Sequence, residues 1–318
     1  MEKKKYTVRK GEPHDLVTIE ALWSASQDAD TAAFRPSSGW WSLVAWADEI
    51  RLLLADHEPI GVVAVVFDER GYVEARLALA PVHREKEAAD LLIEQVTALA
   101  AEAGRAQIRL SIPSLAQWAL EAARRHGYTP LRAIHMMLRP AQEGRLSVAT
   151  PEDVQIRRIR PDEDLAVLDA LNRAWSTTWN FRPIKLESLE ADLRGQRDGF
   201  FVATPKTDEA QIVGTVHALF DPTAQNPDQQ PYAWISNLTV DQSQRGKGLG
   251  RILLATGINY LKEKGAGSIA LGVDGGSIAP MKLYRSVHFE VIRTVDILQY
   301  VLTSDEMATD RRGTTALA

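Results

Sequence analysis

Residues 233–251 read AWISNLTVDQSQRGKGLGR, an apolar segment followed by a stretch that combines three glycines with three basic residues. The first part, 233–240, is typical of a β-strand, and the apolar spacing that begins at Leu249 is typical of an amphipathic helix. Glycines between a strand and a helix let a ligand approach the backbone, and the free N–H groups of a first helical turn favour an anion. We therefore expect a phosphate-binding loop here.

Length and composition limit the possible classes of protein. The chain has 318 residues, which is more than one typical domain and predicts two. A formal net charge of −5 argues against nucleic acid as the main partner, because such surfaces usually carry a basic excess. No apolar run approaches the length of a membrane span, and MEKKKYTVRK at the start lacks an apolar region behind its basic residues. We expect a cytoplasmic protein that binds neither nucleic acid nor membrane.

The chain contains no cysteine. Disulfides, thiolate metal ligands and an acyl-cysteine intermediate are therefore excluded. The seven histidines show no HExxH or comparable ligand spacing, so we expect no metal.

The same order of signals occurs twice along the chain. The segment 6–16 (YTVRKGEPHDL) resembles 154–165 (VQIRRIRPDEDL), and Phe-Arg-Pro recurs at 34–36 and 181–183. Further on, 81–95 aligns with 242–256 at an offset of 161 residues, and a polar insertion at 221–231 accounts for the change of offset. An internal duplication explains this pattern. It predicts domains at 1–140 and 154–305, a linker at 141–153 and a flexible tail at 306–318.

Each copy is predicted to be α+β, with a mixed, mainly antiparallel twisted sheet flanked by helices. In the first copy, apolar segments at 51–57, 61–67 and 72–80 indicate strands, with turns expected at Glu58-Pro59 and at 69–71. A helix over about 84–103 follows, with Gly104 as its stop signal. In the second copy, the helix that begins near Leu249 stops at Gly265.

The loop matches neither of two well-known phosphate loops. There is no GxxxxGK[ST] run, and the pattern GxGxxG fails because Arg251 and Leu253 stand where a third glycine is needed. Residues Arg245 to Gly250 instead match [Q/R]xxGx[G/A], and LYRSVHFE at 283–290 is similar to LYxxxGF. These two motifs resemble those of the GNAT superfamily of N-acetyltransferases, and the resemblance covers roughly 154–303. The duplicated architecture resembles the tandem-domain type that includes mycothiol synthase and its relatives.

The resemblance implies acetyl-CoA as the acyl donor and gives roles to matching residues. The strand residues Leu238, Thr239 and Val240 would lie along the pantetheine arm, with main-chain groups of Leu238 and Val240 offered to it. Ser277 stands where the family usually has an asparagine that reaches CoA. Tyr284 would protonate the departing thiolate. The pyrophosphate would be held by the loop itself, namely Arg245, Gly246, Lys247, Gly248, Leu249, Gly250 and Arg251.

Without cysteine, the acceptor amine must attack the thioester directly in a ternary complex. The family often carries a glutamate as base on the strand before the loop, and the nearest equivalent here is Asn237, which cannot take a proton. His217, Asp221 or an ordered water remain alternatives, and no base is assigned. The glycine of LYxxxGF is replaced by His288.

The first copy departs from the motif at the loop. Its equivalent is 84–89, in which Glu85 and Glu87 replace two glycines, and Ala123 stands at the tyrosine position. Glutamate charge opposes a pyrophosphate, so we interpret 1–140 as a degenerate GNAT-like domain. An unrelated α+β domain is the alternative.

The acceptor side is expected in the segment 172–183. Trp175, Trp179 and Phe181 would wall a cleft between the copies, and Arg182 would recognise an acidic or hydroxylated acceptor, unless the aromatics only pack the interface between the domains. The leading hypothesis is N-acetylation of a small-molecule primary amine by a monomer or homodimer. A catalytically weak acyl-CoA sensor and a peptide or protein N-acetyltransferase are the alternatives.

Overall fold

The computed structural model describes residues 5–30, 47–147, 149, 151–225, 231–304 and 306. The Phe-Arg-Pro segment at 34–36 and all of the expected tail except residue 306 lie outside this range. The chain divides into two compact units. The N-terminal unit comprises Met1–His135, Asp274–Gly276 and Ile292–Ala318, and the second unit comprises Met136–Val273 and Ser277–Val291.

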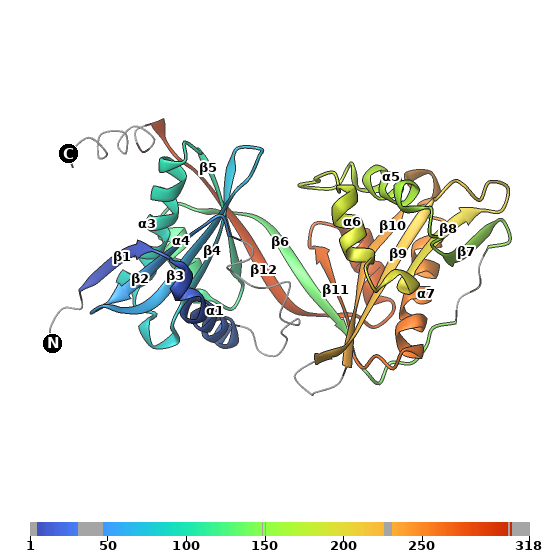
Figure 1. The fold of residues 1–318 in the computed structure, drawn as a ribbon, viewed down its shortest axis with the longest axis horizontal. Helices are drawn as coiled ribbons and strands as arrows, with labels where there is room; N and C mark the ends of the chain where they lie inside the picture. The colour runs from blue at the N-terminus through green and yellow to red at the C-terminus, as the bar shows by residue number, and fades with distance from the viewer. Residues whose placement is uncertain are drawn as a thin grey trace. The chain divides into compact units, whose positions relative to one another are not determined.

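The N-terminal unit is built on a mixed sheet in which β4 (Tyr72–Leu79) and β5 (Gln107–Pro113) run parallel (Figure 1). Four further pairs of neighbouring strands are antiparallel, which agrees with the mixed, mainly antiparallel sheet of the predicted fold class. Its strands, in spatial order, are β1 (Tyr6–Lys10), β2 (Glu49–Ala55), β3 (Glu58–Phe67), β4, β5, β12 (Glu290–Val301) and the first part of β6 (Thr129–Arg139).

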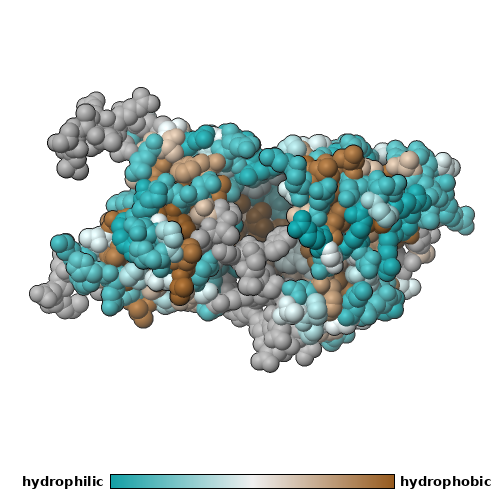
Figure 2. Space-filling view, viewed as in Figure 1, coloured by the Kyte–Doolittle hydropathy of each residue, from teal (hydrophilic) through white to brown (hydrophobic). Residues whose placement is uncertain are grey.

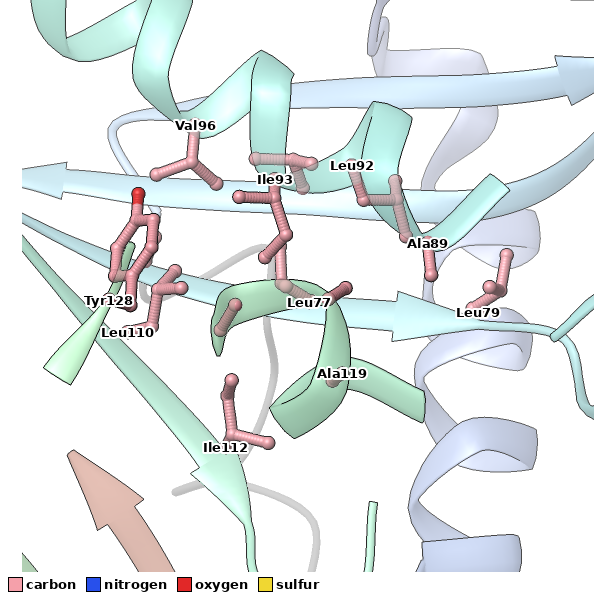
Figure 3. Packing of buried hydrophobic residues seen from close by; sticks show 14 of the residues in the cluster. Leu77, Leu79, Ala89, Leu92, Ile93, Val96, Leu110, Ile112, Ala119 and Tyr128 are labelled. Carbon is pink, nitrogen blue, oxygen red and sulfur yellow. The ribbon is translucent and has the colours of Figure 1, made fainter. Parts of the chain in front are cut away.

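Helices cover both faces of this sheet because its central strands are apolar on both sides. Leu52 and Val62 belong to the core under α1 (Leu16–Asp30), whereas their neighbours Leu53 and Val63 belong to the core under α3 (Lys86–Glu102) and α4 (Gln117–Arg125). Figure 3 shows Leu92, Ile93 and Val96 of α3 directed toward strand residues of this second core.

The second unit repeats this plan with β10 and β11 as its parallel pair. Its strands are β7 (Val154–Arg158), β8 (Phe200–Pro205), β9 (Gly214–Gln225), β10 (Pro231–Val240) and β11 (Ile269–Asp274). One core lies between the sheet and α5 (Asp164–Trp175) with α6 (Leu186–Leu193), and another lies under α7 (Leu249–Glu263) and α8 (Ile278–Arg285). Short 3₁₀ turns occupy Pro13–Asp15, Pro81–His83, Arg197–Gly199 and Gln242–Gln244. None of the described helices is long and apolar enough to cross a bilayer.

Two strands cross the boundary of the sequence repeat. Strand β12, near the end of the chain, pairs with β5 of the N-terminal unit from Val295–Pro113 to Val301–Gln107. Conversely, the end of β6 (Thr129–Arg139) belongs to the second unit, where Met137 is fully buried in the core. The boundaries of the two compact units therefore differ from the boundaries of the sequence repeat. The boundaries 1–140 and 154–305 stay a prediction about the repeat.

Matching ion pairs support the duplication. Arg9 donates two hydrogen bonds, of 2.6 and 2.7 Å, to the carboxylate of Asp15 six residues later. Arg157 donates two, of 2.8 and 2.6 Å, to Glu163, again six residues later. Both pairs join the first strand of a copy to the start of its first helix.

The first hairpin corrects one expectation. The turn lies at Asp56 and His57, with φ of 48° and 74°, and not at Glu58-Pro59. Successive positive φ values give a turn whose twist suits an antiparallel hairpin. Pro59 instead sits within β3, opposite Leu54 and next to a register shift that accommodates its missing N–H.

Arg139 at the end of β6 holds the first part of the expected linker. Its side chain is 1% exposed. The guanidinium donates to the carbonyl oxygens of Val287 (3.0 Å), Glu143 (2.8 Å) and Gly144 (2.6 Å). The side-chain amide of Asn259 on α7 also accepts from and donates to the backbone of Leu146, both at 2.8 Å. Residues 141–146 are therefore bound to the second unit.

Replacing this guanidinium should weaken the second unit. In Arg139→Met, three buried or partly buried carbonyls lose their donor, and we expect a loss of about 3 kcal/mol in the free energy of unfolding, measured with urea. Arg145→Met is the control, because Arg145 is 60% exposed and its ion-pair partner in the described ranges is Glu263. It should cost under ~1 kcal/mol. A smaller loss for Arg139→Met than for the control would contradict this role.

Candidate functional site

The site begins where β10 leaves its parallel neighbour. The pairing of β10 with β11 runs from Ala233 to Ile235, although β10 continues to Val240. Its register with β9 shifts between Ser236 and Thr239, and Asn237 there has a φ of 48°. The sequence predicted no bulge here, and Asn237 was expected only to lack the chemistry of a base. Asparagine is among the residues that adopt positive φ most readily. Its presence inside a predicted strand was therefore the signal in the sequence that could have indicated a bulge.

The bulge leaves main-chain groups on the side of β10 that faces away from β9. The N–H of Asp241 donates to Val213 at 2.8 Å, on the β9 side. Because peptide groups alternate along a strand, those of Val240 and Leu238 point to the other side. This geometry can accept an extended ligand as an added strand.

Thr239 has a different place. Its side chain is buried, and its hydroxyl lies 2.8 Å from that of Thr215 on β9. Thr215 also donates to the carbonyl of Asn237 at 2.6 Å. Thr239 therefore helps to hold the bulged strand, and its own peptide groups face β9.

Two glycines of the loop adopt a left-handed conformation. Gly246 and Gly248 have φ of 80° and 84°, and Gly248 is the residue that precedes α7. A Cβ at either position would meet no atom within 4 Å. Glycine is thus needed there for its backbone conformation. Gly250 lies within the first turn of α7, and a Cβ there would make only ordinary contacts, at 3.5 Å with Leu283 and 3.6 Å with Val240.

The loop presents its N–H groups outward. The N–H groups of Arg251 and Ile252 bond back to the carbonyl of Gly248, at 3.0 and 3.3 Å. Those of residues 246–250, which include Lys247 and Leu249, have no acceptor among the described residues. Together with the helix dipole, these donors form a place for an anion.

Arg245 fixes the loop in position. Its Nε donates to the carbonyl of Val240 at 3.1 Å, and its Nη2 donates to the carbonyl of Ala174, at the end of α5, at 3.0 Å. The side chain therefore ties the loop to the strand and to a helix on the other face of the sheet.

Tyr284 lies on α8 with 8% of its surface exposed. Its ring packs edge-on against Phe289, with the centroids 6.1 Å apart. Burial raises the pKa of the phenol to about 12, so it is protonated at neutral pH. The hydroxyl has no partner in the described part of the chain. Ser277 is half-buried and precedes the first turn of α8, about two turns before Tyr284.

His288 occupies a backbone position that suits glycine. Its φ is 69°, and Gly127, the equivalent residue of the first copy, has a φ of 80°. The substitution of histidine therefore keeps the glycine-like conformation that ends α8, at some cost in strain.

The expected acceptor residues lie together on the loop between α5 and α6. Asn172 fastens this loop, since its side chain donates to the carbonyl of Ile184 (3.1 Å) and accepts from its N–H (2.7 Å). Trp179 and Phe181 are half-buried and Arg182 is exposed.

The two alternative bases have different environments. His217 on β9 is 0% exposed, and its Nε2 donates to the carbonyl of Gln196 at 3.2 Å. Burial lowers its pKa to about 4, so the ring is neutral at physiological pH. Its Nδ1 is buried without a partner among the described residues. Asp221, exposed in the last part of β9, accepts from the N–H and hydroxyl of Thr223, at 2.8 and 2.7 Å.

The equivalent loop of the N-terminal unit has a different chemistry. Glu85 precedes α3, and Glu87 lies in the first turn. The carboxylate of Glu85 accepts a hydrogen bond of 2.8 Å from the hydroxyl of Tyr6. Two acidic side chains thus lie at the helix start, where the second unit has glycines.

No group of three or more histidine, aspartate or glutamate side chains arranged to hold a metal occurs in the described ranges.

On the face drawn in Figure 2, the second unit is mainly hydrophilic with scattered apolar residues, which is ordinary for a folded domain.

Comparisons with known proteins identify the family and the fold. Residues 165–289 match the acetyltransferase (GNAT) family. The chain is 30% identical over 250 residues to a mycothiol acetyltransferase of Kocuria rhizophila, covering 73% of this chain and 78% of that one. The fold of this chain is similar to that of a GCN5-related N-acetyltransferase from Sphaerobacter thermophilus, with a TM-score of 0.73 and 21% identity. The match covers 93% of this chain and 95% of that one. A tandem GNAT protein from the clavulanic acid biosynthesis pathway has a TM-score of 0.67 at 11% identity, with coverage of 94% and 98%.

Two alanine substitutions in the loop should have opposite effects on stability. Gly248→Ala forces a left-handed alanine and should cost about 1 kcal/mol in the free energy of unfolding. Gly250→Ala removes a glycine from a helical turn with room for the methyl group, and should stabilise by about 0.5–1 kcal/mol. Urea unfolding of both variants measures the difference. Equal changes in the free energy of unfolding in the two variants would contradict the left-handed conformation of Gly248.

Proposed function

The chain belongs to the GNAT family of acetyltransferases, and on that premise we propose that it transfers an acetyl group from acetyl-CoA to the primary amine of a small molecule. One observation carries the proposal. The second unit combines a strand whose pairing stops at Ile235 with a glycine loop whose N–H groups are available. The first feature suits a pantetheine arm and the second suits a pyrophosphate.

The donor would bind along these two features in sequence. The N–H groups of the loop from Gly246 to Gly250 would bind the pyrophosphate, whereas the N–H of Arg251 is bonded to the carbonyl of Gly248. The peptide groups of Leu238 and Val240 would bond the pantetheine amides. Arg245 is a positioning residue, because it holds the carbonyl of Val240 and so fixes the strand relative to the loop. Ser277 at the start of α8 would contact CoA near Tyr284.

The transfer itself needs one nucleophile and one acid. The amine nitrogen attacks the thioester carbon, the carbon–sulfur bond breaks, and the thiolate takes the proton of Tyr284. The proton released from the attacking nitrogen leaves to solvent, and the phenolate is reprotonated from water. A phenol with a pKa of about 12 is a weak acid toward an ordinary thiolate. A thiolate released into the same buried surroundings also loses hydration, which raises the pKa of its thiol and reduces the mismatch.

The acceptor would lie against the loop between α5 and α6. Trp179 and Phe181 offer aromatic surface, and the exposed Arg182 offers a donor for an acidic or hydroxylated group. We assign no general base, because His217 is buried and neutral and Asn237 does not titrate. The amine is therefore expected to enter in its neutral form.

The N-terminal unit would take no part in acyl transfer. Glu85 and Glu87 place negative charge at the start of α3, where a pyrophosphate would have to bind. We propose that this unit is a degenerate copy with a structural role.

One observation favours a second candidate function, an acyl-CoA sensor. The strand before the loop carries no titrating side chain at Asn237, and the nearby His217 is buried. A sensor would bind acetyl-CoA without consuming it.

Release of the CoA thiol in the presence of amines separates the two functions. Because the chain has no cysteine, CoA is the only source of thiol when the acceptor lacks one, and a thiol reagent reports turnover directly. The panel should include small primary amines, the amine accepted by mycothiol acetyltransferases and a short peptide, with product mass as a second readout. Acetylation of a small amine supports the proposal. Binding of acetyl-CoA without turnover of any amine would favour the sensor.

Removing the hydroxyl of Tyr284 should slow the chemical step. In Tyr284→Phe we expect kcat to fall about 100-fold with little change in KM, because the phenol acts only as the thiolate departs. Stability should change by less than ~1 kcal/mol, since the hydroxyl has no protein partner among the described residues. The wild-type kcat should show no falling limb from this tyrosine below about pH 10, because its pKa is raised. An unchanged kcat in the variant would remove Tyr284 from the mechanism.

A further inference from the structure

Four basic side chains lie around the first turn of α7 and the end of α8. They are Lys247, Arg251, Lys282 and Arg285, all exposed, and we call them the basic cluster. Arg251 connects the two helices, because its Nη1 donates to the hydroxyl of Ser286 at 2.7 Å. None of the four has a carboxylate partner in the part of the chain that the structure describes.

The positive charges of Lys247 and Arg251 are unfavourable at the N-terminus of α7. The N-terminus of α7 is the positive end of the helix dipole, and its first turn contains no acidic residue. Arg251 in that turn therefore lowers the stability of the helix, and Lys247 beside it adds repulsion. An anion bound at this place would reverse the sign of both effects.

The N-terminal unit provides an internal comparison. The positions equivalent to Arg251 and Ser286 are Asp90 and Arg125, at the offset of 161 residues. Arg125 donates to the carboxylate of Asp90 at 3.0 and 2.6 Å, so the same two helices are joined there by an ion pair.

The two copies differ in charge at half of the cluster. Lys86 and Arg124 are basic at the positions of Lys247 and Arg285, so these two charges are common to both copies. The positions of Arg251 and Lys282 are held in the first copy by the acidic residues Asp90 and Glu121. Arg251 and Lys282 are therefore the charges that distinguish the second unit.

The equivalence of these positions rests on matching geometry. Gly127 follows α4 and His288 follows α8, and both have a positive φ. These two residues are also separated by the offset of 161 residues. Arg84 donates to the carbonyl of Ser26 at 3.2 Å, as Arg245 donates to that of Ala174 at 3.0 Å. One helix pair thus contains acids that offset its basic residues, and the other is left cationic beside the glycine loop.

We propose that the basic cluster binds the 3′-phosphate on the ribose of the acyl-CoA donor, and that the protein thereby selects CoA over dephospho-CoA. This inference rests on the proposed function. The pyrophosphate would occupy the loop N–H groups, whereas the 3′-phosphate is a separate phosphomonoester of the same ligand, with close to two negative charges at neutral pH. Arg251 is held by Ser286 with its remaining donors available to that group.

Calorimetric titration with acetyl-CoA and with acetyl-3′-dephospho-CoA tests the inference. We expect the wild type to bind acetyl-CoA at least about tenfold more tightly, and Arg251→Gln to lose most of that ratio. A second variant, Arg251→Asp with Ser286→Arg, installs the ion pair of the N-terminal unit, so the helices stay joined while the cation is neutralised. It should lose the preference as well. Lys206→Gln, which removes one exposed charge after β8, should keep it.

Loss of the preference in both Arg251 variants, with the control unchanged, supports the inference. Equal affinity of the wild type for the two donors overturns it, as does an equal loss for both donors in Arg251→Gln, which would assign Arg251 to the pyrophosphate. Those results leave the proposed function intact. Failure of the wild type to bind either donor would overturn the proposed function and the inference with it.

Discussion

The candidate site depends on the end of the pairing between β10 and β11 at Ile235. If the pairing continued, the peptide groups of Leu238 and Val240 would be used inside the sheet and no ligand could bond to them. Asn237, which has a positive φ, lies in a bulge of β10. The bulge shifts the register of β10 with β9 just beyond Ile235, the last residue of β10 that pairs with β11. The same strand then leads directly into the glycine loop, and Arg245 ties loop and strand together.

The N-terminal unit has the same framework with different side chains at the equivalent loop. Its parallel pair also stops early, with β4 and β5 paired from Tyr72–Gln107 to Ala75–Leu110. Its loop, however, carries Glu85 and Glu87, and its helices are joined by the pair of Asp90 and Arg125. One fold therefore supports two electrostatic environments, and the difference lies in a few side chains at the start of one helix.

Local features were predictable from the sequence. The glycine loop, the start of the helix after it, the stop at Gly265 and the repeated strand–helix order all follow from short-range patterns. Features that depend on distant residues were not. The pairing of β12 with β5 joins segments far apart in the chain, and no local pattern distinguishes it from pairing within its own copy. The turn at Asp56 and His57 was missed because a proline two residues later gave a stronger turn signal. The role of Asn237 depends on its backbone conformation, which its side-chain chemistry does not reveal.

We propose that only one of the two related units retains an acyl-CoA site. The stoichiometry of acetyl-CoA binding to the intact chain, measured by calorimetry, tests it most directly. We expect one site per chain, lost in Gly248→Glu, which places in the second unit the type of side chain that Glu85 and Glu87 place in the first. Two sites per chain, or one site that survives in Gly248→Glu, would contradict it.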